Sequence, residues 1–165
     1  MSMYVYTTTG THPYLRTYLH DHPERTMTLM QRADSSGTYL LMDESNANSI
    51  FNAPFGYINR YQYQEKPPIG MAVLQHIGLL PEDEKSFLLQ FDKLKATLTN
   101  HPELDCLYLL KSERKMAYLI MTFWQSTDDF HKFEKSIDFQ PLLPYVADHQ
   151  SQSSEITYAD VFYIR

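Results

Sequence analysis

The residues of this chain that could do chemistry are few and scattered. Seven histidines and one cysteine occur in 165 residues, and the sequence has no glycine-rich phosphate loop, Ser-His-Asp order or metal-binding helix motif. Gln75 and His76 stand out because they interrupt a strand-length apolar run, Met71 to Gly78. Side chains alternate along a strand, so Gln75 and His76 are expected to face opposite sides of a sheet.

Each polar candidate also has an ordinary structural explanation. Gln75 is either a hydrogen-bonding contact for a ligand or a buried amide satisfied by its neighbours, and both readings stay open. His76 is a weak metal-ligand candidate on the other sheet face. His20 and His22 lie at the end of a short helix, where imidazoles interact with the last carbonyls and do not make a zinc site. Cys106 lies among apolar strand residues, which is typical of a small buried hydrophobe.

Composition narrows the class of protein. The net charge of -6 is spread without blocks of one sign, so we expect neither nucleic acid nor a membrane surface as a partner. A single cysteine excludes an internal disulfide and suits a reducing compartment. The chain begins without a basic and apolar leader, and no apolar run approaches the roughly 20 residues of a membrane span. We therefore expect a cytoplasmic protein.

The clearest internal boundary is the segment Gln64 to Gly70, where Pro67 and Pro68 stop regular structure. It predicts an N-terminal α/β lobe over residues 1–66 and a second domain over residues 67–165. In the first part we expect strands at 3–7, 27–31, 38–42 and 50–53, a helix opened by Thr11 and Pro13, and a short helix started by Pro54 that carries Tyr57, Ile58 and Tyr61.

The second part has sharper periodicity. It predicts strands at 71–78, 104–111, 116–124 and 156–164, and a helix from Pro81 that ends at His101 and Pro102. Ser126 is expected to cap another helix whose buried stripe is Phe130, Phe133 and Ile137.

This order, βαββαβ, is a ferredoxin-like α+β arrangement with both helices on one face of an antiparallel sheet. The other face would expose apolar side chains, so we predict that a second copy covers it and that the protein is a homodimer.

Several segments resemble the TRAP-like proteins of Gram-positive bacteria. These segments are Tyr4-Val5-Tyr6-Thr7, Gly10-Thr11, Leu15-Arg16-Thr17, His22-Pro23, Leu29-Met30-Gln31, Phe51-Asn52-Ala53-Pro54 with Tyr57, Ala72-Val73-Leu74, Thr122-Phe123-Trp124 and the stretch Phe130 to Phe139. The group includes heme-degrading monooxygenases and belongs to the antibiotic-biosynthesis-monooxygenase superfamily. The resemblance implies the dimeric α/β-barrel version of the ferredoxin-like fold.

In the heme-degrading members an asparagine, a tryptophan and a histidine carry the chemistry. The resemblance places Gln75, Phe133 and Leu143 at these three positions, and it aligns Trp124 with a strand-end tryptophan that is not the catalytic one. Leucine has no nitrogen to bind iron or to transfer a proton. Heme is thus a possible cofactor rather than an established one.

These observations lead to one function hypothesis and two rivals. The first is a binding or regulatory protein that has lost the triad and holds a hydrophobic or aromatic small molecule in an apolar pocket between sheet and second helix. The pocket would be lined by Gln75, Phe133, Leu143, Phe130 and Trp124. The second is an active monooxygenase, either on heme through a substitute ligand such as His76 or His149, or without cofactor on an aromatic substrate. The third is a structural dimer whose N-terminal lobe recruits a protein partner.

Overall fold

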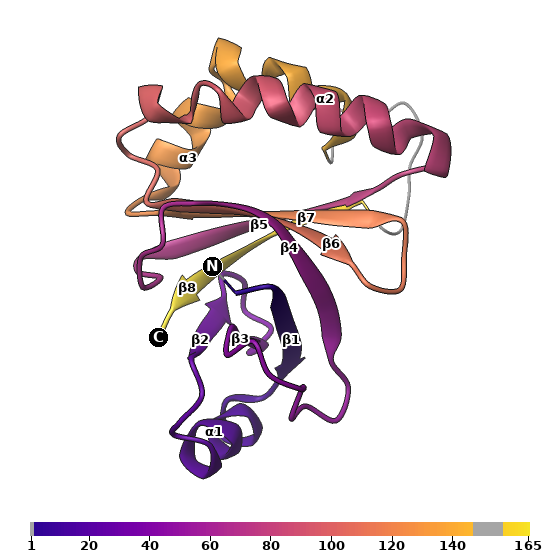
Figure 1. Ribbon diagram of the computed structural model, residues 1–165. Helices are drawn as coiled ribbons and strands as arrows, with labels where there is room; N and C mark the ends of the chain where they lie inside the picture. The colour runs from indigo at the N-terminus through magenta and orange to yellow at the C-terminus, as the bar shows by residue number, and fades with distance from the viewer. Residues whose placement is uncertain (1, 147–156) are drawn as a thin grey trace.

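Eight antiparallel strands close into a single barrel with helices packed on its outside (Figure 1). This arrangement comes from a computed structural model, which describes residues 2–146 and 157–165. The first half of the chain contains β1 (Tyr4–Gly10), α1 (His12–Asp21), β2 (Met27–Arg32), β3 (Tyr39–Asp43) and β4 (Phe55–Tyr63). Helix α1 begins where predicted, because the Thr11 hydroxyl accepts a hydrogen bond from the Tyr14 amide at 3.4 Å.

The second half has the predicted βαββαβ order. Its elements are β5 (Met71–Gly78), the short 3-10 helix η1 (Pro81–Asp83), α2 (Glu84–Lys95), η2 (Leu98–Asn100), β6 (Cys106–Ser112), β7 (Ala117–Trp124), α3 (Thr127–Glu134), η3 (Ile137–Tyr145) and β8 (Tyr158–Ile164). The Ser126 hydroxyl caps α3 by accepting from the Asp129 amide at 3.3 Å. The predicted buried stripe was wrong at Ile137, which is 78% exposed, because α3 ends at Glu134 and the tighter η3 changes the periodicity.

The two halves contribute four strands each in the same spatial order. Around the barrel the order is β1-β3-β2-β8-β5-β7-β6-β4, so the first half reads β4-β1-β3-β2 and the second reads β8-β5-β7-β6. In each half the fourth strand lies beside the first, and the third lies between the first and the second. The pairs β2–β8 and β4–β6 join the halves. The barrel therefore combines two ferredoxin-like sheets within one chain.

Strand β4 corrects the expectation of a strand at 50–53 and a short helix after Pro54. Residues 55–63 are extended, and the buried side chains of Tyr57 and Asn59 alternate with more exposed neighbours. Both edges of β4 are paired, with Val5 of β1 opposite Tyr57 and Leu110 of β6 opposite Asn59. This pairing satisfies the backbone on both sides and overrides the helix-starting tendency of proline.

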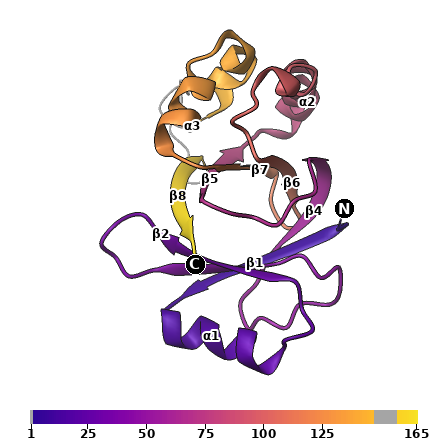
Figure 2. The same ribbon diagram turned by 90° about the vertical axis from the view of Figure 1, so that its left-hand side faces the viewer.

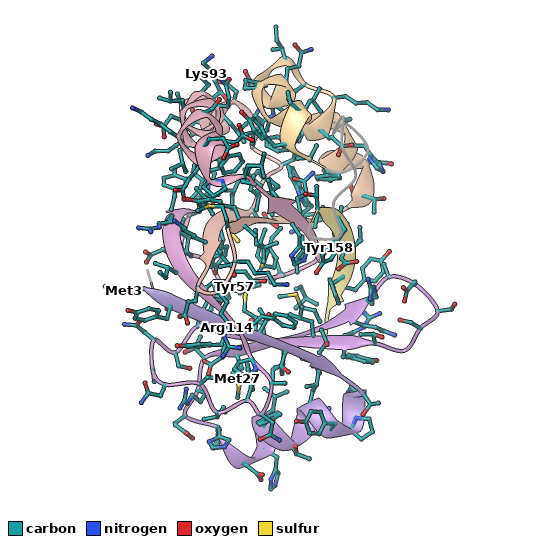
Figure 3. The ribbon with its side chains drawn as sticks, turned by 90° about the vertical axis from the view of Figure 1, so that its right-hand side faces the viewer. Met3, Met27, Tyr57, Lys93, Arg114 and Tyr158 are labelled. Carbon is teal, nitrogen blue, oxygen red and sulfur yellow. The ribbon has the colours of Figure 1, made fainter. Side chains whose placement is uncertain are left out.

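The face predicted to be covered by a second copy is covered by the first half of the same chain (Figure 2). Inside the barrel Val5, Met30 and Met42 pack against Leu74 and Phe162. Tyr57 also lies in this interior layer between the halves (Figure 3). The argument for a homodimer was therefore wrong about this face, and the homodimer itself stays a prediction.

The boundary between residues 66 and 67 falls in the connection from β4 to β5. The division into 1–66 and 67–165 stays a prediction, although both halves contribute strands to one barrel. Within the described residues, no helix combines the length and apolarity needed to cross a membrane.

Candidate functional site

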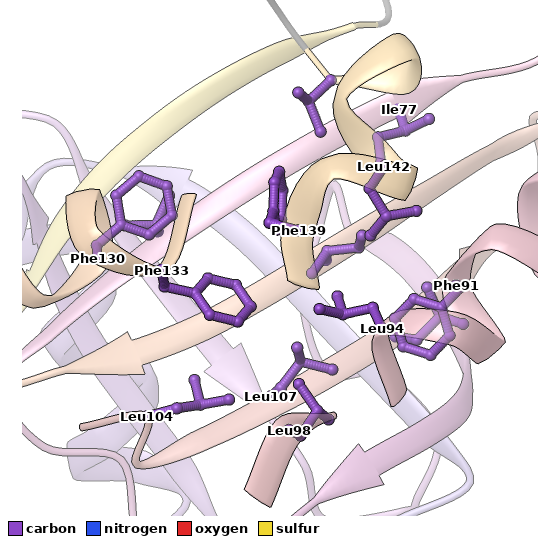
Figure 4. Packing of buried hydrophobic residues seen from close by; sticks show 14 of the residues in the cluster. Ile77, Phe91, Leu94, Leu98, Leu104, Leu107, Phe130, Phe133, Phe139 and Leu142 are labelled. Atoms are coloured by element: carbon purple, nitrogen blue, oxygen red, sulfur yellow. The ribbon is translucent and has the colours of Figure 1, made fainter. Parts of the chain in front are cut away.

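An aromatic layer fills the space between the sheet and the segment α3–η3. The Trp124 ring lies 5.8 Å from Phe130 and 5.1 Å from Phe133, and Phe133 lies 5.3 Å from Phe139, all between ring centroids. Figure 4 shows Phe130, Phe133, Phe139 and Leu142 directed toward the strands. The structure thus brings together Trp124, Phe130 and Phe133, three of the predicted ligand contacts.

Phe133, which the resemblance is expected to place at the family tryptophan, is enclosed by the protein itself. It is 1% exposed, while Phe139 and Leu142 are 0% exposed. Leu143, which the resemblance is expected to place at the family histidine, is half-buried at the edge of the same cluster. Dense packing of this kind leaves few voids larger than a water molecule. The side chains around Phe133 are therefore closed off from solvent, and the pocket expected there stays a prediction.

His101 is a polar neighbour of this layer that the sequence analysis used only as a helix end. Its ring lies edge-on to Phe133 at 5.0 Å. Its Nε2 lies 2.8 Å from Asp138 Oδ2, and its Nδ1 lies 3.5 Å from Glu103 Oε1. Both ring nitrogens face carboxylates, so His101 ties the end of η2 to η3. No local pattern indicates this, since the contact spans 37 residues.

Gln75 faces the helices, on the same side of β5 as Val73 and Ile77. It is 4% exposed, and its Oε1 atom has no hydrogen-bond partner among the described residues. Leaving such an acceptor unpaired costs about 1 to 3 kcal/mol. Gln75 lies opposite Ile120 of β7, four residues from Trp124, which is about 13 Å along the strand. It therefore sits in the helix-facing layer but apart from the Trp124 aromatics.

The indole of Trp124 is satisfied internally. Its Nε1 donates to the Thr122 hydroxyl at 2.7 Å, and the whole side chain is 0% exposed. Trp124 can thus contribute an apolar wall, whereas its N–H group is already engaged.

His76 faces away from this layer, as strand alternation predicted. Its ring stacks on Tyr158 with centroids 4.1 Å apart. Burial lowers the pKa of His76 to about 4, although the nearby Asp160 carboxylate opposes the shift. A neutral imidazole results at physiological pH. The other proposed substitute ligand, His149, lies outside the described residues.

Metal-binding potential is low in the part of the chain that the structure describes. No group of three or more His, Cys, Asp or Glu side chains there could hold a metal ion. Cys106 is free and buried on β6, and burial raises the pKa of its thiol to about 12. The thiol is therefore protonated and poorly suited to bind metal or act as a nucleophile.

The chain is similar to known proteins over nearly its whole length, although the sequence identities are low. The chain is 26% identical over 159 residues to a heme-degrading monooxygenase of Listeria monocytogenes, covering 96% of this chain and 93% of the relative. It resembles the crystal structure of an uncharacterized ferredoxin-fold protein related to antibiotic biosynthesis monooxygenases from Listeria monocytogenes, with a TM-score of 0.84, 24% identity, and coverage of 100% and 96%. A heme-degrading enzyme from Listeria monocytogenes matches with a TM-score of 0.79, 25% identity, and coverage of 97% and 98%. No family model matches the chain.

These similarities confirm the predicted fold class and the resemblance to heme-degrading and antibiotic-biosynthesis-monooxygenase-like proteins. The described residues nevertheless do not fit heme at the position that the resemblance implies. Leu143 offers no nitrogen, both nitrogens of nearby His101 face carboxylates, and His76 is on the opposite face of β5.

Proposed function

We propose that this chain is a non-catalytic relative of the heme-degrading monooxygenases, acting as a binding or regulatory protein. The observation that carries the proposal is the packing around Phe133, which is 1% exposed between Trp124, Phe139 and His101. Heme degradation needs an iron ligand and an open site for the macrocycle. Among the described residues, Leu143 supplies no iron ligand, and Phe133 and Phe139 are closed off from solvent.

Gln75 is the polar contact that we assign to a ligand. The Oε1 atom of Gln75 is a buried acceptor in an otherwise apolar layer, and a ligand that donates one hydrogen bond would satisfy it. A small aromatic molecule with a hydroxyl group could do this. Its hydroxyl would donate to Oε1, and its ring would be of the same apolar kind as Val73, Ile77 and Ile120. We therefore infer a hydrophobic or aromatic small molecule as ligand.

A heme titration tests the loss of catalysis. Hemin added to the purified protein is expected to give a broad absorption like that of hemin without protein, and no decay beyond that control with ascorbate and oxygen. A sharp Soret band that decays under these conditions would refute the proposal. Leu143→His is a matched variant, since it restores an imidazole while Phe133 and Phe139 stay closed off from solvent. We expect this variant to lack the sharp band as well.

A fluorescence titration with 1-naphthol tests the assigned contact. Wild-type protein is expected to bind the probe. Gln75→Leu replaces the acceptor with an apolar side chain of similar size, and this variant should bind the probe about tenfold more weakly. Equal affinity in both proteins would remove Gln75 from the site.

A further inference from the structure

A groove lies between α2 and the strands β4, β6 and β7. Figure 2 shows α2 on the β6–β4 side of the sheet and α3 on the β8–β5 side. The groove has a volume of about 410 Å³, within the range of about 300 to 1,000 Å³ that is typical of small-molecule sites. Half of its lining residues are charged, and the other half are aromatic or aliphatic. The charged ones are Arg60, Glu84, Asp92, Lys95 and Lys111.

A β-bulge in β4 directs Arg60 into this groove. The register between β4 and β6 shifts between Asn59 and Tyr61, so Arg60 is the extra residue of the bulge. Side chains normally alternate along a strand, yet the neighbours Arg60 and Tyr61 both line the groove. Bulges often redirect a side chain in this way next to a functional site. The bulge therefore places a cation and an aromatic ring on the same wall.

Arg60 and Lys95 are the cations of the groove that have no ion pair within residues 2–146 and 157–165. Arg60 makes no side-chain hydrogen bond there either, and its side chain is exposed. The Nζ atom of Lys95 lies over the Tyr61 ring, 4.8 Å from its centroid. Asp92, one turn before Lys95 on α2, forms no ion pair with either cation. Both cations are therefore available to an anion that enters the groove.

The Glu84 carboxylate, by contrast, is already engaged. Its Oε2 atom lies 2.6 Å from Lys111 Nζ and accepts from the Tyr118 hydroxyl at 2.7 Å. The hydrogen bonds from Lys111 and Tyr118 lower the pKa of Glu84, and the charge of Arg60 adds to this effect from beyond ion-pair distance. Glu84 is therefore ionised, and Lys111 compensates its charge.

The charged side chains of the groove leave an excess of positive charge. Arg60, Lys95 and Lys111 are three cations, whereas Glu84 and Asp92 are two carboxylates, so the sum is one positive charge. The whole chain has a net charge of -6. The groove is thus locally cationic on an acidic protein, and complementary charge favours an anionic ligand there.

The geometry points to a binding site for a small aromatic carboxylate in this groove. The carboxylate would pair with Arg60, because a planar guanidinium can donate two parallel hydrogen bonds to it, and Lys95 would add a second positive charge. The ring would lie against Tyr61 and Leu88, which are both half-buried. The inference does not depend on the proposed function, since Gln75 does not line the groove.

Isothermal titration calorimetry with two matched probes tests this inference on the wild-type protein. 2-Naphthoate is expected to bind at least tenfold more tightly than 2-naphthamide, which has nearly the same shape but no charge. The comparison needs no variant, so it holds whether or not a substituted protein folds. Absence of 2-naphthoate binding at millimolar concentration, or equal affinity for the two probes, would overturn the inference.

Two variants with the same change of net charge locate the cation that matters. Arg60→Gln removes the guanidinium from the groove, and we expect an affinity loss for 2-naphthoate of about tenfold. Arg114→Gln removes an exposed guanidinium from the turn between β6 and β7, outside the groove, and should change the affinity less than about twofold. Equal losses in both variants, or no loss in Arg60→Gln, would refute the assigned pairing.

Discussion

Gly70 lies directly against the carbonyl oxygen of Trp124, so that a Cβ atom at residue 70 would sit 2.2 Å from that oxygen. Gly70 also has a φ of +76°, a left-handed conformation that favours glycine. Its own carbonyl accepts from the Ile164 amide at 2.9 Å, just before β5 begins between β7 and β8. The glycine therefore allows the connection between the two halves to enter the barrel.

Gly70→Ala should destabilise the protein by about 3 kcal/mol, since it adds left-handed strain to a clash with a backbone atom. Urea denaturation measures the change. Gly37→Ala is the matched control, because Gly37 has a φ of +74° and no atom within 4 Å of its Cβ position. The control should lose only about 1 kcal/mol. Similar losses of stability in both variants would show that the contact with the Trp124 carbonyl does not contribute to the effect of Gly70→Ala.

Gln75→Leu is expected to leave the free energy of unfolding unchanged or to increase it by about 1 kcal/mol, because it removes a buried acceptor that has no partner among the described residues. Thr122→Val is the contrasting variant. It leaves the Trp124 N–H without its acceptor and should cost about 1 to 3 kcal/mol. Thermal unfolding of both variants measures the two changes in stability. A clear loss of stability in Gln75→Leu would mean that the Gln75 side-chain amide has a hydrogen-bond partner in solution.

His76 should make the protein less stable in mild acid. Its pKa in the folded protein is about 4, below the ordinary value of 6.5, so the unfolded chain binds the proton more readily. The stabilising contribution of the neutral ring is complete above about pH 7 and is lost as the pH falls from 6.5 toward 4, by at most about 3 kcal/mol. Denaturant unfolding at several pH values measures this slope.

His76→Gln provides the reference for that experiment, since it removes the titration but keeps a polar side chain. The stability difference between wild type and His76→Gln should change across this pH window and stay constant above it. A difference that is constant from pH 7 to pH 4 would contradict the assigned burial of His76.

A fragment of residues 67–165 should associate with itself. Without the first half of the chain, Leu74, Leu110 and Phe162 would be exposed on one face of its sheet. Light scattering after size-exclusion chromatography is expected to give at least a dimer, and Leu74→Glu in the fragment should weaken association. A folded, monomeric fragment would show that the interior face tolerates water and that the predicted domain 67–165 is independent.

The second half of the fold was predictable because its signals are local. Helix α2 has apolar residues at helical spacing, Ser126 caps α3, and Met71 to Gly78 forms a continuous apolar strand. The alternation of side chains along a strand is also enough to predict that Gln75 and His76 face opposite sides of the sheet. The lack of an iron ligand at residue 143 was also predictable, because a leucine side chain has no atom that can bind iron.

Tertiary structure alone decided what covers each of these faces. The strand character of residues 55–63 depends on pairing with β1 and β6, and barrel closure depends on β2 meeting β8 more than 120 residues later, as in the pairing of Met30 with Ile164. The enclosure of Phe133 by His101 and the hydrogen bond from Tyr108 to Glu44 are likewise long-range contacts. Periodicity records which side of an element is apolar, but it carries no information on which distant segment, or which molecule, will bury that side.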